Sequence, residues 1–463
     1  MDKKKLENMR YLFSPQSVAV VGASQNPAKL GFHVMKSLVK GGFEGDIIPI
    51  NPSMKEIMGI KVFPSLEKYA GDIDLSIVVV PAKSVREVFL QCRKKGVRGI
   101  VLITAGFKEI EDPMGAELHE QIKGIADEAH IPVIGPNTFG MINFHSKLNA
   151  SFTPEFSHIR KGKIALVSQS GGMAHLLGFL AIREDVGFSK IVGIGNRLNV
   201  DFPEMIEYLS QDPDTEAIAL YVEGTDEARR MLEAAKRAVS TTPIVAYKTG
   251  SAQVGDLASA SHTGSLAGNS GIYEGAFKQA GIVPAQSSME LLDMAKVLAH
   301  CPRPRGNRTA ILSGQAGPGM AGADVCEREG LKIVSFTNDT QGKINQLLPP
   351  LALRTNPVDM GPAWYDASAI VGIVKAVMED KNVDAILLYM MFASANADAL
   401  ERMSGLLKEW HQRKPVISCF LAPPGIWDIQ VKELEESGAL VNLSTPERAA
   451  RAMAFLYNYS SPV

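Results

Sequence analysis

Short, β-branched apolar runs alternate with longer amphipathic segments along almost the whole chain, and this alternation limits the possible folds more than any other feature. The runs SVAVVGA, DIIPIN, LSIVVVP, RGIVLITAG and IPVIGPN are separated by helical patterns such as KSVREVFLQCRKKG. Strands that alternate with helices predict βαβ units and parallel sheets covered by helices on both faces. We therefore expect an α/β protein with doubly wound parallel sheets.

The same alternation begins again twice, at GKIALVSQSGG and at NRTAILSGQAGPG. A polar segment, TPEFSHIRKGK, precedes the first of these restarts, and a linker rich in proline and arginine, HCPRPRGNR, precedes the second. A chain of 463 residues is also too long for one ordinary core. We predict three doubly wound parallel-sheet domains, at residues 1–155, 156–303 and 304–463.

Composition and charge argue against several classes of protein. Hydrophobic residues make up 46% of the chain, charged residues 21%, and the net charge at pH 7 is −2, so we expect neither nucleic acid nor a membrane as a partner. The first residues, MDKKKLENMR, lack the apolar stretch of a signal peptide, and no run approaches the ~18 apolar residues of a membrane helix. The four cysteines lie far apart, which favours reduced thiols, no structural metal and a cytoplasmic location.

Each expected domain begins with an apolar strand, a turn rich in glycine, serine or both, and a helical pattern. The three turns are GAS at 22–24, SQSGG at 168–172 and SGQAGPG at 313–319. Glycine permits a tight turn, and the free N–H groups and the dipole at the start of a helix favour an anion. Three such turns indicate three related folds and more than one phosphate group to bind.

The first turn does not fit a dinucleotide site. After Gly22 the next glycine is Gly31, so the G-x-G-x-x-G pattern is missing. The second strand ends in Asn51, where NAD-binding proteins usually carry an acidic residue for the ribose. Lys29 adds a positive charge that suits a phosphate-rich ligand. A Rossmann-like site for another adenine nucleotide fits better than an NAD-dependent dehydrogenase.

Ten short motifs then follow one another in a characteristic order: GAS, INP, VPA, TAGF, GPN, SQSGG, YVEG, SHTGSLAG, GPG and NPVD. This succession resembles the alpha subunit of ADP-forming acetate–CoA ligase, in the NDP-forming acyl-CoA synthetase family, which is related to succinyl-CoA synthetase. The resemblance covers essentially the whole chain, and SASHTGSLAG is its most specific motif. It implies a Rossmann-like CoA-binding first domain and flavodoxin-like second and third domains.

The resemblance also implies a reaction, in which acyl-CoA, ADP and phosphate are interconverted with carboxylic acid, CoA and ATP. Phosphate attacks the thioester to give an acyl phosphate, and the phosphoryl group passes to a histidine and then to ADP. This implies that the phosphorylated residue is His262 and that its carboxylate partner is Glu223, 39 positions upstream. A nucleophilic imidazole needs one bare nitrogen and an acceptor for its other N–H, which a glutamate at a strand end can supply.

Coenzyme A and phosphate would be held by the glycine-rich turns and the strand ends. The residues implied to bind coenzyme A are Gly22, Ser24, Lys29, Asn51, Val80, Pro81 and Gly106. A transferring phosphoryl group needs fixed hydrogen-bond donors, which helix N-termini supply. The expected phosphate-binding residues are Ser170, Gly171, Gly172, Thr263, Gly264, Gly317 and Gly319. His175, Asn196 and Asp201 are further candidates for the lining of this site.

The nucleotide site is expected on another chain. Neither an ATP-grasp domain nor a P-loop of the form G-x-x-x-x-G-K-[ST] occurs in the sequence. The resemblance implies an ATP-grasp beta subunit that binds Mg²⁺ and ADP or ATP, in an alpha2beta2 assembly. The alternative is a non-catalytic, CoA-binding regulatory protein of the same fold, which the intact SHTG segment and Glu223 disfavour.

Overall fold

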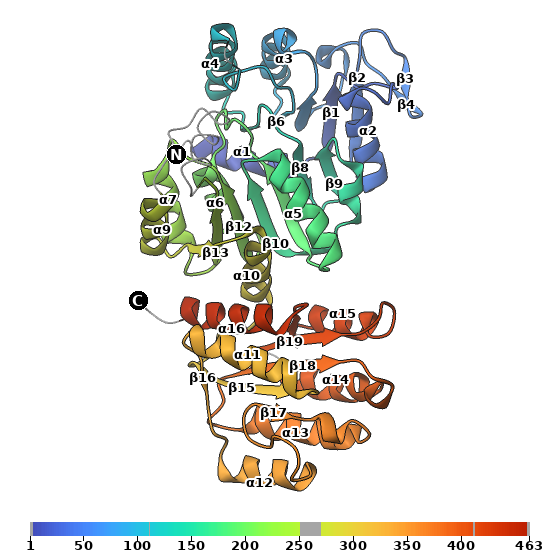
Figure 1. Cartoon of the computed structure of the whole chain (residues 1–463). Coiled ribbons are helices and arrows are strands. Elements are labelled where there is room, and N and C mark those ends of the chain that lie inside the picture. The colour runs from blue at the N-terminus through green and yellow to red at the C-terminus, as the bar shows by residue number, and fades with distance from the viewer. Residues whose placement is uncertain (1–2, 111, 251–269, 411–412, 461–463) are drawn as a thin grey trace. The chain divides into compact units, whose positions relative to one another are not determined.

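The computed structural model describes residues 3–110, 112–250, 270–410 and 413–460. They belong to two compact units, Met1–Leu292 and Asp293–Val463 (Figure 1). Both units are built on mainly parallel sheets, as the alternation of strands and helices predicts. Within the described stretches, no helix is long and apolar enough to span a membrane.

The first sheet has five parallel strands in the order β2-β1-β5-β6-β7. Its strands are β1 (Ser17–Val21), β2 (Asp46–Ile50), β5 (Leu75–Val78), β6 (Gly99–Leu102) and β7 (Val133–Ile134). Its helices are α1 (Lys3–Phe13), α2 (Leu30–Gly41), α3 (Ala82–Lys95) and α4 (Pro113–Glu128), and the short elements are β3 (Glu56–Ile57), β4 (Ile60–Lys61) and η1 (Leu66–Lys68). The strand order reverses between β1 and β5, and ligands of open α/β sheets bind at the carboxyl ends of strands at such a point.

The strands of this sheet are buried on both faces. In β1, Val18 and Val20 join the core that contains α1 and α2, whereas Ala19 and Val21 join the core that contains α3 and α4. A strand covered by helices on both sides has no polar face, which is why these segments appear in the sequence as unbroken apolar runs.

The second sheet lies in the same unit and has seven strands in the order β14-β13-β12-β10-β11-β8-β9. Its strands are β8 (Gly140–Asn143), β9 (Leu148–Ser151), β10 (Lys161–Ser168), β11 (Phe188–Gly193), β12 (Ala217–Val222), β13 (Ile244–Lys248) and β14 (Val283–Ala285). Its helices are η2 (Pro154–His158), α5 (Gly171–Arg183), α6 (Phe202–Leu209), α7 (Ala228–Ala238) and α9 (Ser270–Gln279). The helix α10 (Ser288–His300) begins in the first unit and continues into the second. The strands β10 to β14 are parallel, whereas β8 pairs antiparallel with β11 and with β9.

One hydrophobic core joins the two sheets of the first unit. Ala165 and Val167 of β10 belong to the same buried cluster as Val18 and Val20 of β1. The segment from β8 to β9 contributes to the second sheet although it precedes residue 155. The three-domain division at 1–155, 156–303 and 304–463 stays a prediction.

The second unit holds a parallel sheet in the order β16-β15-β18-β19-β20, with β17 also paired to β15. Its strands are β15 (Arg308–Ser313), β16 (Lys332–Ile333), β17 (Val358–Asp359), β18 (Ala385–Met391), β19 (Val416–Leu421) and β20 (Val441–Asn442). Its helices are α11 (Ala316–Arg328), α12 (Asn338–Leu347), α13 (Ala367–Glu379), α14 (Ala399–Trp410), α15 (Asp428–Glu436) and α16 (Pro446–Ser460), with η3 (Gly361–Ala363) and η4 (Ser394–Asn396). Ile386 and Leu388 of β18 pack with α12, α13 and α14, whereas Leu387 and Tyr389 pack with α11 and α16. The prediction of doubly wound α/β sheets is confirmed.

Candidate functional site

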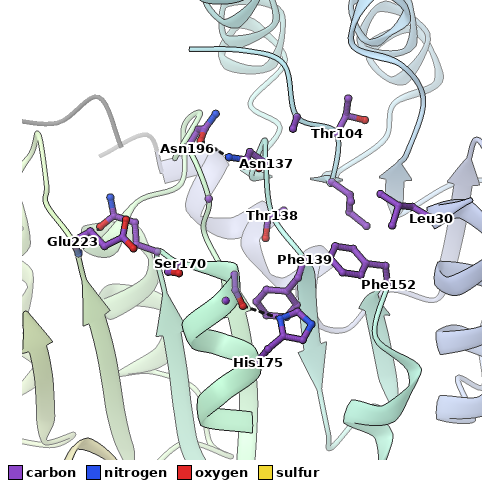
Figure 2. A pocket seen from close by; sticks show the side chains of 16 residues that line it. Leu30, Thr104, Asn137, Thr138, Phe139, Phe152, Ser170, His175, Asn196 and Glu223 are labelled. Atoms are coloured by element: carbon purple, nitrogen blue, oxygen red, sulfur yellow. Dashed lines mark hydrogen bonds between the residues drawn. The ribbon is translucent and has the colours of Figure 1, made fainter. Parts of the chain in front are cut away.

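A cavity of about 440 Å³ lies in the first unit, where the carboxyl end of the first sheet meets the start of α5 (Figure 2). Thr104, which follows β6, and Leu30, which begins α2, line it from the first sheet. Residues 170–172 and Glu223 line it from the second sheet. The structure therefore brings four of the predicted site residues into one space, beside the sheet that was predicted to bind coenzyme A.

The N-terminus of α5 presents backbone donors to this cavity. Ser170 is the N-cap residue, and its Oγ accepts a hydrogen bond from the Met173 N–H at 3.3 Å. The N–H groups of the first helical turn have no partner within the helix, so the helix start attracts an anion. A side chain at Gly171 would meet no atom within 4 Å, which shows that the space beside this turn is open.

Glu223 directly follows β12, and its side chain lines the same cavity as Ser170 (Figure 2). The residue is 9% exposed. Its backbone N–H donates to Oε1 of Gln169 at 2.9 Å, and the N–H of Gly224 donates to the same oxygen at 3.1 Å. The strand end that carries the carboxylate is therefore fixed by the residue that immediately precedes Ser170.

His175 also lines the cavity, but both of its ring nitrogens are engaged within the protein. Nδ1 lies 2.8 Å from the carbonyl oxygen of Gly171, and Nε2 lies 2.8 Å from Oγ1 of Thr153. A carbonyl oxygen only accepts, so Nδ1 carries the proton, and in the neutral ring Nε2 accepts from the threonine hydroxyl. The ring also packs against Phe139 and Phe156, with centroids 5.4 and 5.0 Å away. His175 therefore lines the cavity as a structural residue and does not act as a nucleophile.

The residues predicted to bind coenzyme A lie together at the carboxyl ends of β1, β2, β5 and β6. Asn51 joins two of these strand ends, because its Nδ2 donates to the carbonyl oxygen of Ala23 at 2.8 Å. The Lys29 side chain is exposed at the start of α2. The turn at Gly22 requires glycine, since its φ is +95° and a Cβ would lie 2.8 Å from the carbonyl oxygen of Val79. Contact of these residues with coenzyme A stays a prediction.

Two of the other predicted phosphate-binding residues lie in the second unit, and three predicted residues fall outside the described part of the chain. His262, Thr263 and Gly264 lie outside the described residues. Gly317 and Gly319 lie in the first turn of α11 in the second unit. The turn before α11 repeats a feature of the turn before α5, because the hydroxyl of the strand's last serine donates to the carbonyl oxygen two residues later in both.

A second cavity of the first unit, of about 290 Å³, is lined mainly by charged side chains. Arg197, 7% exposed, donates to the carbonyl oxygen of Gly224 at 3.1 Å and pairs with Asp226 at 3.2 Å and with Asp201 at 3.4 Å. Asn196 lines the first cavity, as expected, whereas Asp201 lines the second. Burial raises the pKa of Asp201 to about 6, and burial lowers the pKa of His119 to about 4.

Among the residues of the first cavity that were not predicted are two with amide side chains, Gln169 and Asn137. Gln169 lies inside the SQSGG motif, which was the signal that could have identified it. Asn137 lies in the GPN motif, has a positive φ of 56°, and its Nδ2 donates to Oδ1 of Asn196 at 3.4 Å. The glycine residues of these motifs were the basis of the site prediction, which did not include the amide side chains beside them.

Comparison with known proteins agrees with this geometry. Residues 16–143 match the CoA binding domain family, and residues 161–298 match the family of succinyl-CoA ligase like flavodoxin domains. The alpha subunit of ADP-forming acetate–CoA ligase II from Pyrococcus furiosus is 38% identical over 451 residues, which are 96% of each chain. The alpha subunit of ligase I from the same organism is 33% identical and is matched over 98% of each chain.

A solved structure matches over the same extent. It is that of the dinucleotide-forming acetyl-coenzyme A synthetase 1 of Ca. Korarchaeum cryptofilum, in complex with phosphate and ADP. The TM-score is 0.88 at 32% identity, with 98% of this chain and 97% of that chain covered. Because relatives of this identity match it over nearly their whole length, the chain belongs to the family of ADP-forming acetate–CoA ligase alpha subunits.

Proposed function

We propose that this chain is the alpha subunit of an NDP-forming acyl-CoA synthetase. It interconverts acyl-CoA, ADP and phosphate with a carboxylic acid, CoA and ATP, through an acyl phosphate and a phosphohistidine at His262. The observation that supports this most strongly is the single cavity in which Glu223, the N-terminus of α5 and the carboxyl end of the first sheet meet. A thioester, a phosphate and a carboxylate acceptor are needed within one space for this chemistry.

The reaction would run in two steps on this chain. A phosphate oxygen attacks the thioester carbon, the C–S bond breaks, and CoA leaves as a thiolate that takes up a proton. The unprotonated nitrogen of His262 then attacks phosphorus, the bond between phosphorus and the acyl oxygen breaks, and the carboxylate leaves with the electron pair. Glu223 accepts a hydrogen bond from the other ring N–H and stabilises the positive charge that the phosphorylated ring acquires.

Phosphoryl transfer to ADP is proposed to need a partner. The printed names of two relatives describe alpha subunits, which supports a second kind of subunit in this protein as well. We propose that it is an ATP-grasp beta subunit that binds Mg²⁺ and the nucleotide, and that the assembly is alpha2beta2. Gly317 and Gly319 of α11 are proposed as further phosphate donors, together with Thr263 and Gly264.

The test is chemical labelling of the full chain. Incubation with acetyl-CoA and radiolabelled phosphate should place label on His262, in a bond that acid breaks and base does not. The His262→Ala variant should take up no label, and label that survives this substitution would contradict the assignment. Tight CoA binding without any labelling of the wild type would instead support the regulatory alternative.

A further inference from the structure

Gln169 lies between the end of β10 and the N-cap residue of α5, and it is 6% exposed. Its backbone N–H donates to the carbonyl oxygen of Tyr221 at 3.2 Å, which ties the turn to the neighbouring strand β12. It lines the cavity that Glu223 and Ser170 also line. The residue therefore lies among the groups proposed to act on phosphate, although no role has been assigned to it.

The orientation of the Gln169 amide is fixed by what surrounds it. Oε1 receives two backbone N–H groups, those of Glu223 at 2.9 Å and Gly224 at 3.1 Å. Backbone N–H groups only donate, so the oxygen and the nitrogen of the amide cannot be exchanged. The NH₂ group must then be directed away from the Glu223–Gly224 backbone, because the amide is planar.

The NH₂ group of Gln169 has no acceptor among the described residues. It is also not one of the described polar side-chain atoms that are fully buried without a partner, so it reaches open space. The open space that this side chain lines is the cavity at the N-terminus of α5. A donor group that is held rigidly, is more than nine-tenths buried and has no partner in the protein points to a ligand that accepts hydrogen bonds.

We propose that Gln169 is a catalytic residue whose NH₂ group donates to a non-bridging oxygen of the phosphate or acyl phosphate bound at the N-terminus of α5. This inference rests on the proposed function. In the transfer step the N–P bond forms, the bond from phosphorus to the acyl oxygen breaks, and the carboxylate leaves with the electron pair. Negative charge stays on the three other phosphoryl oxygens throughout, and a fixed donor stabilises it.

A neutral amide suits this position better than a cationic side chain. Gln169 touches the backbone of Glu223, so a lysine or arginine here would lie next to that carboxylate. The cation would then pair with the carboxylate, which is needed as the acceptor for the imidazole N–H. Glutamine can position the strand end with its oxygen and meet the phosphoryl group with its nitrogen, without forming an ion pair.

The second unit offers a natural contrast. Ser168 is paired with Tyr221 across β10 and β12, and Ser313 is paired in the same way with Tyr389 across β15 and β18. Glu223 and Met391, each two residues after its tyrosine, therefore correspond. Gln315 contacts Met391 with both ends of its amide, since Oε1 accepts from the Met391 N–H at 3.3 Å and Nε2 donates to its carbonyl oxygen at 3.2 Å. In this register Gln315 corresponds to Ser170, because both are N-cap residues, so its amide reaches the strand end from one position further along the chain than Gln169 does. The NH₂ group of Gln315 is used by the backbone, unlike that of Gln169.

The experiment compares Gln169→Glu and Gln169→Leu with Gln121→Glu, which makes the same charge change on an exposed glutamine of α4. The first variant keeps two oxygens that can accept from the Glu223 and Gly224 N–H groups, but at neutral pH it has no donor. We expect the rate of phosphohistidine formation from acetyl-CoA and radiolabelled phosphate to fall about 10²–10³-fold in both Gln169 variants. The Gln121→Glu chain should label at the wild-type rate.

The pH dependence separates a donor role from a structural one. Protonation of the introduced carboxyl supplies an O–H donor, so the rate of Gln169→Glu relative to the wild type should rise as the pH is lowered from about 8 to about 5.5, whereas that of Gln169→Leu should not. Circular dichroism of each variant confirms that it is folded. A Gln169→Glu rate within threefold of the wild type at pH 8, or a ratio that does not change with pH, overturns the inference. If the wild type itself forms no phosphohistidine, the proposed function fails, and this inference fails with it.

Discussion

The buried carboxyl group of Asp201 provides a direct test of the electrostatics beside the site, through the substitution Asp201→Asn. Oδ1 accepts from the Phe202 N–H at 2.7 Å and caps α6, while Oδ2 lies 3.4 Å from Nη1 of Arg197. Burial raises the pKa of this carboxyl from its ordinary value of 3.8 to about 6, although the Arg197 guanidinium acts in the opposite direction. Because the side chain is only 13% exposed, water screens these interactions weakly.

A rise in pKa of this size corresponds to about 3 kcal/mol. Between pH 4 and 6 the folded protein holds the proton and the unfolded chain does not, so the free energy of unfolding falls as the pH rises through this range. Asparagine has no charge to bury and caps a helix as well as aspartate does. The attraction of Arg197 is already included in this net shift. We therefore expect Asp201→Asn to stabilise the first unit by up to about 3 kcal/mol at pH 7.5 and to give no gain near pH 4.

Hydrogen–deuterium exchange of peptides that span α6 measures this free energy locally, at pH 4.5 and at pH 7.5, after correction for the intrinsic exchange rates. The three tryptophans, Trp364, Trp410 and Trp427, all lie in the second unit, so urea unfolding followed by their fluorescence serves as an internal control that should not change. A variant that is less stable than the wild type at pH 7.5 would refute the reasoning. So would a difference that is the same at both pH values.

Three further predictions concern the cavity and the turns around it. Glu223→Gln should slow phosphohistidine formation about 10- to 100-fold, since a charge-assisted hydrogen bond contributes about 1.5–3 kcal/mol, and a titration should find CoA affinity unchanged. Gly22→Ala should lower the free energy of unfolding in urea by about 2 kcal/mol or more, because φ is +95° and the added Cβ meets the Val79 carbonyl oxygen. As a control, Gly171→Ala should change this free energy by less than about 1 kcal/mol, because the added Cβ meets no atom within 4 Å. Arg197→Met should cost about 3–5 kcal/mol in thermal unfolding, because buried carboxylate and carbonyl oxygens lose their donor.

The sheets could be predicted because their strands are buried on both faces. The segment SVAVV of β1 has no exposed residue, so its burial is visible in the sequence as an apolar run. The strands β8 and β9, GMIN and LNAS, are equally buried but contain polar residues that bond within the fold, such as Asn149 to Ser157. Their antiparallel pairing to the second sheet could not be inferred, because neither segment shows the regular apolar and polar alternation, or the apolar run, that distinguishes a strand from a loop.

The positions of the site residues could be predicted in part for a similar reason. Carboxyl ends of parallel strands meet at one edge, which is why Ser170 and Glu223 were expected together and line one cavity. The function inferred for Gln169 depends instead on which backbone groups its amide meets after β10 and β12 have paired. Asp201 was a candidate for the same cavity from its position in the sequence, but it caps α6 and faces the second cavity. The role of His262 stays a prediction.

The distribution of charge around Glu223 explains why an anion could be processed here without a cation in contact with it. Within the described part of the chain, the residues that line the first cavity include no lysine or arginine, and Glu223 is their only carboxylate. Arg197 contacts the Gly224 carbonyl oxygen beside this strand end, and it is balanced by Asp201 and Asp226 in the second cavity. We therefore expect oriented dipoles, those of the α5 N-terminus and of the Gln169 amide, to stabilise a phosphoryl group bound in this cavity. Dipoles would stabilise the phosphoryl oxygens without forming an ion pair with Glu223, the carboxylate that we propose as the acceptor for the imidazole N–H of His262.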